Sequence, residues 1–468
     1  MIFYIIHKDV RVICYGAFGY CKKLAEVTIP DSVIFIGGQA FSDCGLVNIT
    51  IPNSVIKIGD GSFSGCHNLQ RIIVDAKNSD YDSRNNCNAI IETRSNILIA
   101  GCQNTSIPNG VVSIGKRAFS YNIDLSDITI PPSMVHIPDG AFSHCNGLMS
   151  VTILNGVKTI GKEAFSGCDN MTNIVIPDSV TTIGDGAFEG CDKLRSITIP
   201  RSVTSIGRGL FSGIRMNGDT NGACCGYNNL ERIIVDIDNP QYDSRYNCNA
   251  IIETQSNTLI AGCQNTVIPN GITNIDTWAF EGCVRLTKIV IPGSVACIPD
   301  CVFEFCEGLT AVTLLKGVTS IGKMAFYGCN KLSDIVFPES ITTIGERAFA
   351  GCDKLTRITI PHSVSHLGTE AFAGMDSTAD YQGFFDGRNN IERIIVDERN
   401  AFYDSRNDCN AIIETISNTL IAGCRNTIIP KGVKTIGKRA FAYCEEMTEI
   451  EIPDGVIEIM DYAFSGCI

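Results

Sequence analysis

The feature that most restricts the fold of this chain is a sequence period of 23 residues. A phenylalanine, usually preceded by alanine, marks each repeat; most gaps between successive phenylalanines are 23 residues, and two are 69. The marked positions are Phe18, Phe41, Phe63, Phe119, Phe142, Phe165, Phe188, Phe211, Phe280, Phe303, Phe326, Phe349, Phe372, Phe441 and Phe464. A fixed period of this length is typical of stacked repeat proteins, in which each repeat contacts only its neighbours. We therefore expect a single solenoid domain over residues 1–468, with no capping repeat at either end.

A longer repeat is superimposed on the short one. A 36-residue segment begins at positions 75, 236 and 397, so its period is 161 residues, which is seven times 23. Its central part, as in NCNAIIETRSNILIAGC, reads as two strands around a four-residue turn. We predict variant blocks that contain a hairpin near residues 71–110, 232–271 and 393–432, each replacing two of every seven ordinary repeats.

One ordinary repeat, called a rung below, predicts its own local structure. Residues 197–199 alternate apolar and polar, as in a strand with one buried face, and Pro200 ends that strand because it cannot donate to a sheet ladder. Phe188 and Cys191, with Leu194 three residues later, have the spacing of one apolar face of a short helical turn. The fold class predicted is an α/β repeat: a right-handed solenoid of about twenty rungs, strand-rich with short helical turns.

The consensus LxxIxIPxxVxxIGxxAFxxCxx resembles the BspA-like leucine-rich repeat family. It is read directly in KLRSITIPRSVTSIG and KLTRITIPHSVSHLG, and the resemblance covers essentially the whole chain. The resemblance implies a surface protein of a bacterium or a protist parasite, located extracellularly or on the cell surface, that adheres to protein or glycan partners such as host or matrix proteins. The alternative is a structural spacer that projects another domain.

Composition and motifs exclude several other classes of protein. The net charge of −13 comes without a basic stripe, which argues against nucleic-acid partners. No apolar run is long enough to span a bilayer, and the N-terminal residues do not read as a convincing signal peptide. Catalytic and cofactor-binding motifs such as GxSxG, HExxH and the phosphate-binding loop are missing from the sequence. We therefore expect no enzymatic activity and no cofactor.

One candidate binding face follows from the strand pattern. The outward residue between the two isoleucine positions of the first strand is threonine in seven of eleven rungs, and valine or glutamate in the others. The threonines are Thr28, Thr50, Thr129, Thr152, Thr198, Thr313 and Thr359. Either this row binds a partner, as extended repeat surfaces do, or β-branched threonine simply suits an exposed strand. An ice-binding array is a weaker alternative, because other residues interrupt the row.

The second candidate surface is the thrice-repeated block itself. Its recurring polar signature consists of Tyr81, Asp82 and Arg84, then Tyr242, Asp243 and Arg245, then Tyr403, Asp404 and Arg406. These residues form either a repeated binding module or structural punctuation, because Asp and Asn readily bond their own backbone in turns.

Cysteine is frequent, with 23 in the chain, and twelve lie three residues after the rung phenylalanine. At that slot we interpret cysteine as a small buried hydrophobe. Six others form pairs that are symmetric about the hairpin turn: Cys87 with Cys102, Cys248 with Cys263, and Cys409 with Cys424. Across a regular hairpin these would face each other, either as disulfides or as packed thiols.

No metal site is predicted. Cys297, Cys301 and Cys306 lack the spacing of a zinc site and fall at ordinary rung positions. His362 and His366 are four residues apart, but on an extended segment this spacing does not bring them together.

Overall fold

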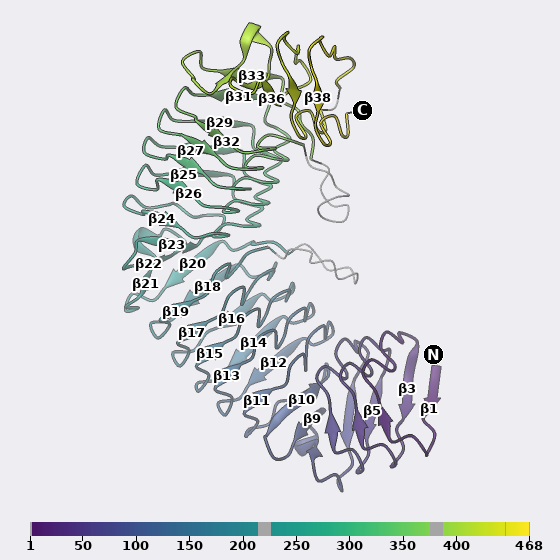
Figure 1. Ribbon diagram of the computed structural model, residues 1–468. Coiled ribbons are helices and arrows are strands. Elements are labelled where there is room, and N and C mark those ends of the chain that lie inside the picture. Colours follow the sequence, from purple (N-terminus) through teal and green to yellow (C-terminus); the bar gives the residue numbers. More distant parts are fainter. Residues whose placement is uncertain (1, 214–225, 375–386, 445, 468) are drawn as a thin grey trace. The chain divides into compact units, whose positions relative to one another are not determined.

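The computed structural model describes residues 2–213, 226–374, 387–444 and 446–467. The chain forms two compact units, the first holding most of residues 1–241 and the second most of residues 242–468. Each unit is a strand-rich solenoid in which a rung contributes a longer first strand and a two-residue second strand (Figure 1). No α-helix occurs among the described residues.

The first strands carry the outward threonine row. They are β1 (Ile2–Ile5), β3 (Leu24–Thr28), β5 (Asn48–Ile51), β7 (Arg71–Val74), β12 (Asp127–Ile130), β14 (Ser150–Ile153), β16 (Asn173–Val175), β18 (Ser196–Ile199), β20 (Arg232–Val235), β25 (Lys288–Ile291), β27 (Ala311–Leu314), β29 (Asp334–Val336), β31 (Arg357–Ile360) and β33 (Arg393–Val396).

The second strands follow the first strands, after a proline in most rungs. They are β2 (Val12–Ile13), β4 (Phe35–Ile36), β6 (Lys57–Ile58), β11 (Ser113–Ile114), β13 (His136–Ile137), β15 (Thr159–Ile160), β17 (Thr182–Ile183), β19 (Ser205–Ile206), β24 (Asn274–Ile275), β26 (Cys297–Ile298), β28 (Ser320–Ile321), β30 (Thr343–Ile344), β32 (His366–Leu367), β37 (Thr435–Ile436) and β38 (Glu458–Ile459).

Both kinds of strand pair in parallel with the same position of the next rung. In the first unit Thr129 pairs with Thr152, and His136 pairs with Thr159, 23 residues later. In the second unit Val290 pairs with Thr313 in the same way. Equal positions therefore stack along each unit, so a residue type that recurs every 23 residues becomes a continuous row.

Inside each unit the stacked apolar positions form the core. The rung phenylalanines lie face to face, and the ring centroids of Phe142 and Phe165 are 5.4 Å apart, those of Phe165 and Phe188 5.8 Å. Both Phe142 and Phe165 are fully buried. Such stacking adds to the stabilisation that burial of the rings provides.

The segment around each phenylalanine differs from the predicted helical turn. It is a run of overlapping tight turns in which residues four positions apart, such as Gln39 and Asp43, adopt positive φ angles of 53° and 55°. The N–H of Ala40 bonds back to Gly37 within the turn, while the N–H of Phe41 reaches the carbonyl of Ser62 in the next rung at 2.8 Å. A helical turn would direct all N–H groups along its own axis, whereas this geometry links neighbouring rungs.

Each variant block adds three strands and a short 3₁₀ turn. These elements are β8 (Tyr81–Asp82), η1 (Arg84–Asn86), β9 (Ala89–Glu92) and β10 (Ile97–Gly101) in the first block; β21 (Tyr242–Asp243), η2 (Arg245–Asn247), β22 (Ile251–Glu253) and β23 (Thr258–Ala261) in the second; and β34 (Tyr403–Asp404), η3 (Arg406–Asp408), β35 (Ile412–Glu414) and β36 (Thr419–Ala422) in the third.

The hairpin of the first block rejoins the regular solenoid on one side. β9 pairs antiparallel with β8 and β10, and β10 then pairs in parallel with β11 of the next rung. Gly101 ends β10 where a Cβ atom would lie 2.2 Å from the ring of Phe119. Glycine is therefore required there, because no side chain fits between the hairpin and the phenylalanine ladder.

Candidate binding surfaces

The seven predicted threonines all lie exposed on first strands, on the outward side of the parallel sheets. Their hydroxyl groups form no hydrogen bond with any described residue. Another set of threonines, just before the second strands, behaves differently. The hydroxyls of Thr181 and Thr342 donate to the backbone carbonyls of Lys158 and Thr319 in the preceding rung, at 3.2 and 3.1 Å. The stacked backbone thus accepts hydrogen bonds from the threonine hydroxyls that precede the second strands. The hydroxyls of the outward row on the first strands stay open to solvent.

Valine occupies the same outward row in several rungs that lack threonine. The exposed fractions of Val175, Val290 and Val336 are 65%, 51% and 70%. Next to this row lies a second outward row, in which Asp127 and Ser150 pair on adjacent strands. Each unit therefore offers a strip that combines hydroxyl, methyl and charged groups.

The signature of the variant block has a different role from the threonine row. Tyr81, Tyr242 and Tyr403 have exposed fractions of only 2%, 5% and 4%. The N–H of Ile58 donates to the phenolic oxygen of Tyr81 at 2.9 Å, and Leu367 does the same for Tyr403. The tyrosines therefore lie in the interior and cannot belong to a surface block that contacts a partner.

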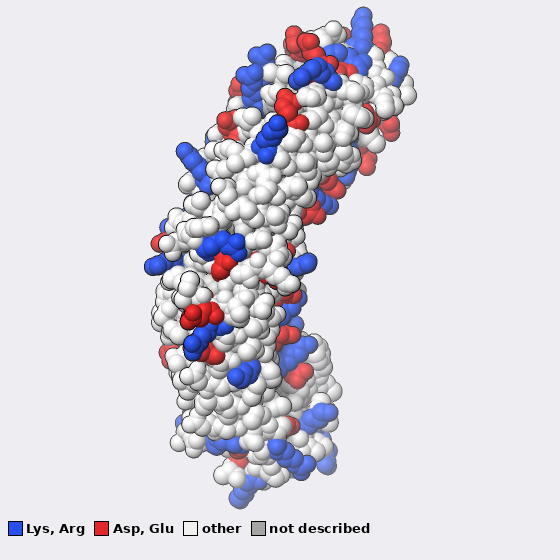
Figure 2. Space-filling model, turned by 90° about the vertical axis from the view of Figure 1, so that its left-hand side faces the viewer, with Lys and Arg blue, Asp and Glu red and all other residues white. Residues whose placement is uncertain are grey.

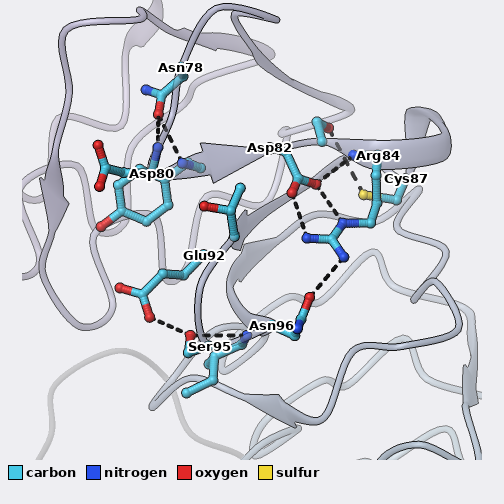
Figure 3. A network of polar contacts seen from close by, with 12 residues as sticks. Asn78, Asp80, Asp82, Arg84, Cys87, Glu92, Ser95 and Asn96 are labelled. Carbon is cyan, nitrogen blue, oxygen red and sulfur yellow. Dashed lines mark hydrogen bonds and ion pairs between the residues drawn. The ribbon is translucent and has the colours of Figure 1, made fainter.

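The aspartate and arginine of the signature form a half-buried ion pair that fastens the turn. Arg84 donates from Nε and Nη2 to the carboxylate of Asp82, at 2.8 and 2.6 Å, and from Nη1 to Asn96 Oδ1 at 2.8 Å (Figure 3). The hydrogen bonds to Asp82 raise the pKa of Arg84. The pairs Arg245–Asp243 and Arg406–Asp404 repeat this arrangement. The donors of this arginine are thus satisfied inside the block. This favours a structural role for the signature over a role as a binding module.

Asn78 recurs in all three copies of the block, as Asn239 and Asn400, and it has a structural role. Its carboxamide is buried and donates to the carbonyls of Pro52 and Val55 at 2.8 and 3.0 Å, while its oxygen accepts from the N–H groups of Asp80 and Tyr81 (Figure 3). The same bonds recur at Asn400. One side chain therefore joins the start of the block to the rung before it.

Replacing Asn78 with alanine is expected to lower the free energy of unfolding by about 2–3 kcal/mol, because buried backbone groups lose their partners. Urea unfolding followed by circular dichroism measures this change. The control is Asn109→Ala, at an exposed position, which should stay within about 0.5 kcal/mol of the parent chain. Equal effects of the two substitutions would contradict the role assigned to Asn78.

The 21 cysteines among the described residues are free thiols. At the slot after the phenylalanine the thiol is more than a hydrophobe, because the Sγ atoms of Cys145 and Cys168 donate to the carbonyls of Phe119 and Phe142 at 3.0 and 3.2 Å. Burial raises the pKa of Cys145 to about 12. These thiols therefore stay protonated at neutral pH and link each rung to the one before it.

The hairpin strand that leads to Cys102 carries a register shift. Leu98 pairs with Ile91, but a register shift then places Ala100, rather than Ile99, opposite Ile90. The thiol of Cys102 donates to the carbonyl of Asn88 at 3.4 Å, and that of Cys87 lies near the carbonyl of Ala89. Both are buried, and burial raises the pKa of each. That the two cysteines of each pair face each other, as a disulfide or as packed thiols, remains a prediction.

Sequence reasoning also missed one cluster of ionisable side chains. It compared His362 only with His366, whereas the structure places the Nδ1 atom of His362 beside carboxylates of the rungs on either side, Glu339 and Asp397. Aligning the sequences of successive rungs by their prolines would have revealed this cluster.

The surface charge does not form a basic patch on the face seen in Figure 2. Much of that face is uncharged, and lysines and arginines lie in small groups together with aspartates and glutamates. No helix in the described part of the chain has the length and apolar character needed to cross a membrane.

This strand-rich stack with a 23-residue period defines a solenoid of the leucine-rich-repeat class. The family model of the BspA type leucine rich repeat region, with six copies, matches residues 2–94, 99–217, 256–378 and 414–468. The chain belongs to the BspA-type leucine-rich repeat family. A search of curated proteins found no match.

Solved structures resemble the chain along most of its length. The structure of a leucine rich cell surface protein from Faecalibacterium prausnitzii is 26% identical, with a TM-score of 0.54, and the match covers 84% of this chain and 87% of that protein. A leucine-rich repeat protein from Bacteroides ovatus is 24% identical, with a TM-score of 0.37 and coverage of 87% and 81%. The pneumococcal vaccine antigen PcpA is 17% identical, with a TM-score of 0.40 and coverage of 99% and 87%. None of these descriptions names an enzymatic activity.

Proposed function

We propose that this chain is a non-enzymatic recognition module that binds protein or glycan partners at a cell surface. The observation that carries the proposal is the difference between the two sets of threonines. Those before the second strands use their hydroxyls on the backbone, as at Thr181, whereas the outward row of the first strands keeps its hydroxyls available. Hydroxyl groups that the fold does not use are free to bond a partner.

The composition of the outward row suits such partners. Exposed methyl groups at Val175, Val290 and Val336 alternate with threonine hydroxyls, and charged or polar residues flank them. Interfaces combine apolar contacts with about one hydrogen bond per 100–200 Å², and this strip offers both kinds of contact. Its partly apolar character also supports a macromolecular partner over a regular lattice such as ice.

The proposal includes a location at the cell surface. It is supported by family membership and by the description of the Faecalibacterium prausnitzii structure as a cell surface protein. The competing function is a spacer that projects another domain and binds nothing itself.

The test measures binding of the purified chain to immobilised extracellular-matrix proteins and to a glycan array. Thr152→Glu places a charge in the middle of the outward row and should weaken any binding detected by about tenfold or more, equivalent to about 1.4 kcal/mol. The matched control is Asn109→Glu, which adds the same charge at an exposed position away from the first strands. Absence of binding across both panels would favour the spacer, and equal effects of the two substitutions would exclude this face.

A further inference from the structure

Three ionisable side chains from successive turns of the second unit meet at one place. Glu339 and His362 each follow the proline that ends a first strand, and Asp397 comes directly after β33 in the next turn. The N–H of Asp397 donates to the carbonyl of Ile360 at 2.9 Å, which fixes this residue beside the preceding rung. Rung stacking therefore assembles the group, although its members are 23 and 35 residues apart in sequence.

The ligand atoms of these side chains lie close together. The Nδ1 atom of His362 is 2.6 Å from Oε2 of Glu339 and 3.9 Å from Oδ2 of Asp397, and all three ligand atoms are within 4.8 Å of one another. Nδ1 is shielded from solvent, and its approach to Glu339 does not have hydrogen-bond geometry. A shielded nitrogen beside two carboxylate oxygens, without a hydrogen bond, is an arrangement that a cation would stabilise.

We propose that Glu339, His362 and Asp397 form a binding site for a divalent transition-metal ion of the zinc class. One imidazole nitrogen and two carboxylate oxygens are ligands that zinc accepts, at about 2.0–2.2 Å from the metal. Calcium selects oxygen ligands instead. Three protein ligands leave a fourth position of the ion open to water or to a group from a partner. The site is independent of the outward threonine row, so the two proposals can fail separately.

The other two copies of the long repeat provide an internal comparison. The corresponding residues are Asp31, Asn53 and Asp75 in the first copy, and Asp178, Arg201 and Asp236 in the second. Both copies keep the two carboxylates but replace the histidine. In the second copy Arg201 lies 3.7 Å from Asp178 and supplies a positive charge of its own. Only the third copy has an imidazole between two acids.

Arg399 is the cation that competes with a metal. Its Nη2 atom is 2.7 Å from Asp397 and 3.8 Å from Glu339, and its side chain is 65% exposed. The hydrogen bonds from Arg399 lower the pKa of Asp397 to about 2, so this carboxylate is ionised at neutral pH. Because the guanidinium group is exposed, it can turn into solvent when a metal ion binds, but its charge opposes that ion.

The experiment is isothermal titration of the full chain with ZnCl₂ at neutral pH, under reducing conditions. His362→Asn introduces the residue of the first copy and should remove one zinc equivalent, or weaken that site by about a hundredfold or more. His366→Asn, four residues away on β32, is the matched control and should bind like the parent chain. Zinc held by the thiols is common to all three proteins and therefore cancels in the comparison.

A second variant and a second probe make the test independent of a folding defect. Arg399→Ala removes the competing charge and should tighten the site several-fold. Co²⁺ is the second probe: the absorption spectrum of the Co²⁺-loaded His362→Asn protein is subtracted from that of the parent chain. The difference spectrum should be that of nitrogen and oxygen ligands, without a sulfur charge-transfer band. Equal zinc binding by the parent and His362→Asn, or no tightening in Arg399→Ala, would overturn the proposal and leave His362 as a partner in an ion pair only.

Discussion

Replacing Phe165 with alanine is expected to lower the free energy of unfolding of the first unit by about 3–5 kcal/mol. The ring has no exposed surface and lies between those of Phe142 and Phe188, at 5.4 and 5.8 Å between centroids. The substitution removes its buried area, leaves a cavity and ends two ring contacts at once. Neighbouring rungs cannot close the gap, because the N–H of Phe165 donates to the carbonyl of Ala187 in the next rung, at 3.0 Å, and fixes their spacing.

Urea unfolding monitored by circular dichroism tests this expectation. The control is Thr152→Ala, on the outward face of β14, which should cost less than about 1 kcal/mol because only strand propensity changes. A loss below 1 kcal/mol for Phe165→Ala would show that the phenylalanine ladder contributes little to stability.

Much of the regular fold could be predicted because each rung repeats the same physical solution. The alternation of Val151, Thr152 and Ile153 predicts a strand with two residues inward and one outward, and the structure has this pattern. The family and the strand-rich solenoid were likewise predictable from the IPxxVxxIG consensus. Periodicity alone converts such a local pattern into a stacked core, because equal residues lie above one another.

The structure departs from the prediction where backbone geometry, rather than the pattern of apolar and polar side chains, determines the local fold. Positive φ angles at Gln39 and Asp43 replace the expected helical turn, and the signal for them is partial, because glycine holds the position equivalent to Asp43 in some rungs, as at Gly65 and Gly167, but not in others. In the hairpin, a register shift places Ala100, rather than Ile99, opposite Ile90, and the facing of the two cysteines across it stays a prediction. A shift of one residue changes every partner beyond it.

The candidate sites were harder to predict than the fold because they depend on contacts between rungs. Strand alternation was sufficient to place the threonine row outward. It did not show that Tyr81 enters the core, since its role depends on the N–H of Ile58, 23 residues earlier. The cluster at His362 requires the alignment of an ordinary rung with the start of a variant block, where the 23-residue period is interrupted.

Alkaline pH is expected to destabilise the second unit strongly. Cys283, Cys306, Cys329 and Cys352 occupy the same slot on successive rungs and are buried. Burial raises the pKa of each thiol above its ordinary value of 9.0. The thiols of Cys306 and Cys329 also donate to the carbonyls of Phe280 and Phe303, which requires them to be protonated.

The direction of the pH effect follows from these raised pKa values. Below pH 9 the thiols are protonated in both the folded and the unfolded chain, and the stability is fully present. Above pH 9 the unfolded chain releases these protons while the folded chain retains them, so the free energy of unfolding falls as the pH rises. Each thiol contributes about 1.4 kcal/mol per pH unit in that range. Four thiols together should remove about 5 kcal/mol between pH 8 and pH 10.

The measurement is urea unfolding in the presence of a reductant at several pH values from 7 to 10. Tyrosines and lysines also titrate near the upper limit, so the decisive comparison is with a variant that has alanine at all four cysteine positions. This variant starts from a lower stability, because it loses packing at each slot, but its stability should fall much less steeply above pH 9. An equally steep fall in both proteins would mean that groups other than the buried thiols determine the alkaline limit.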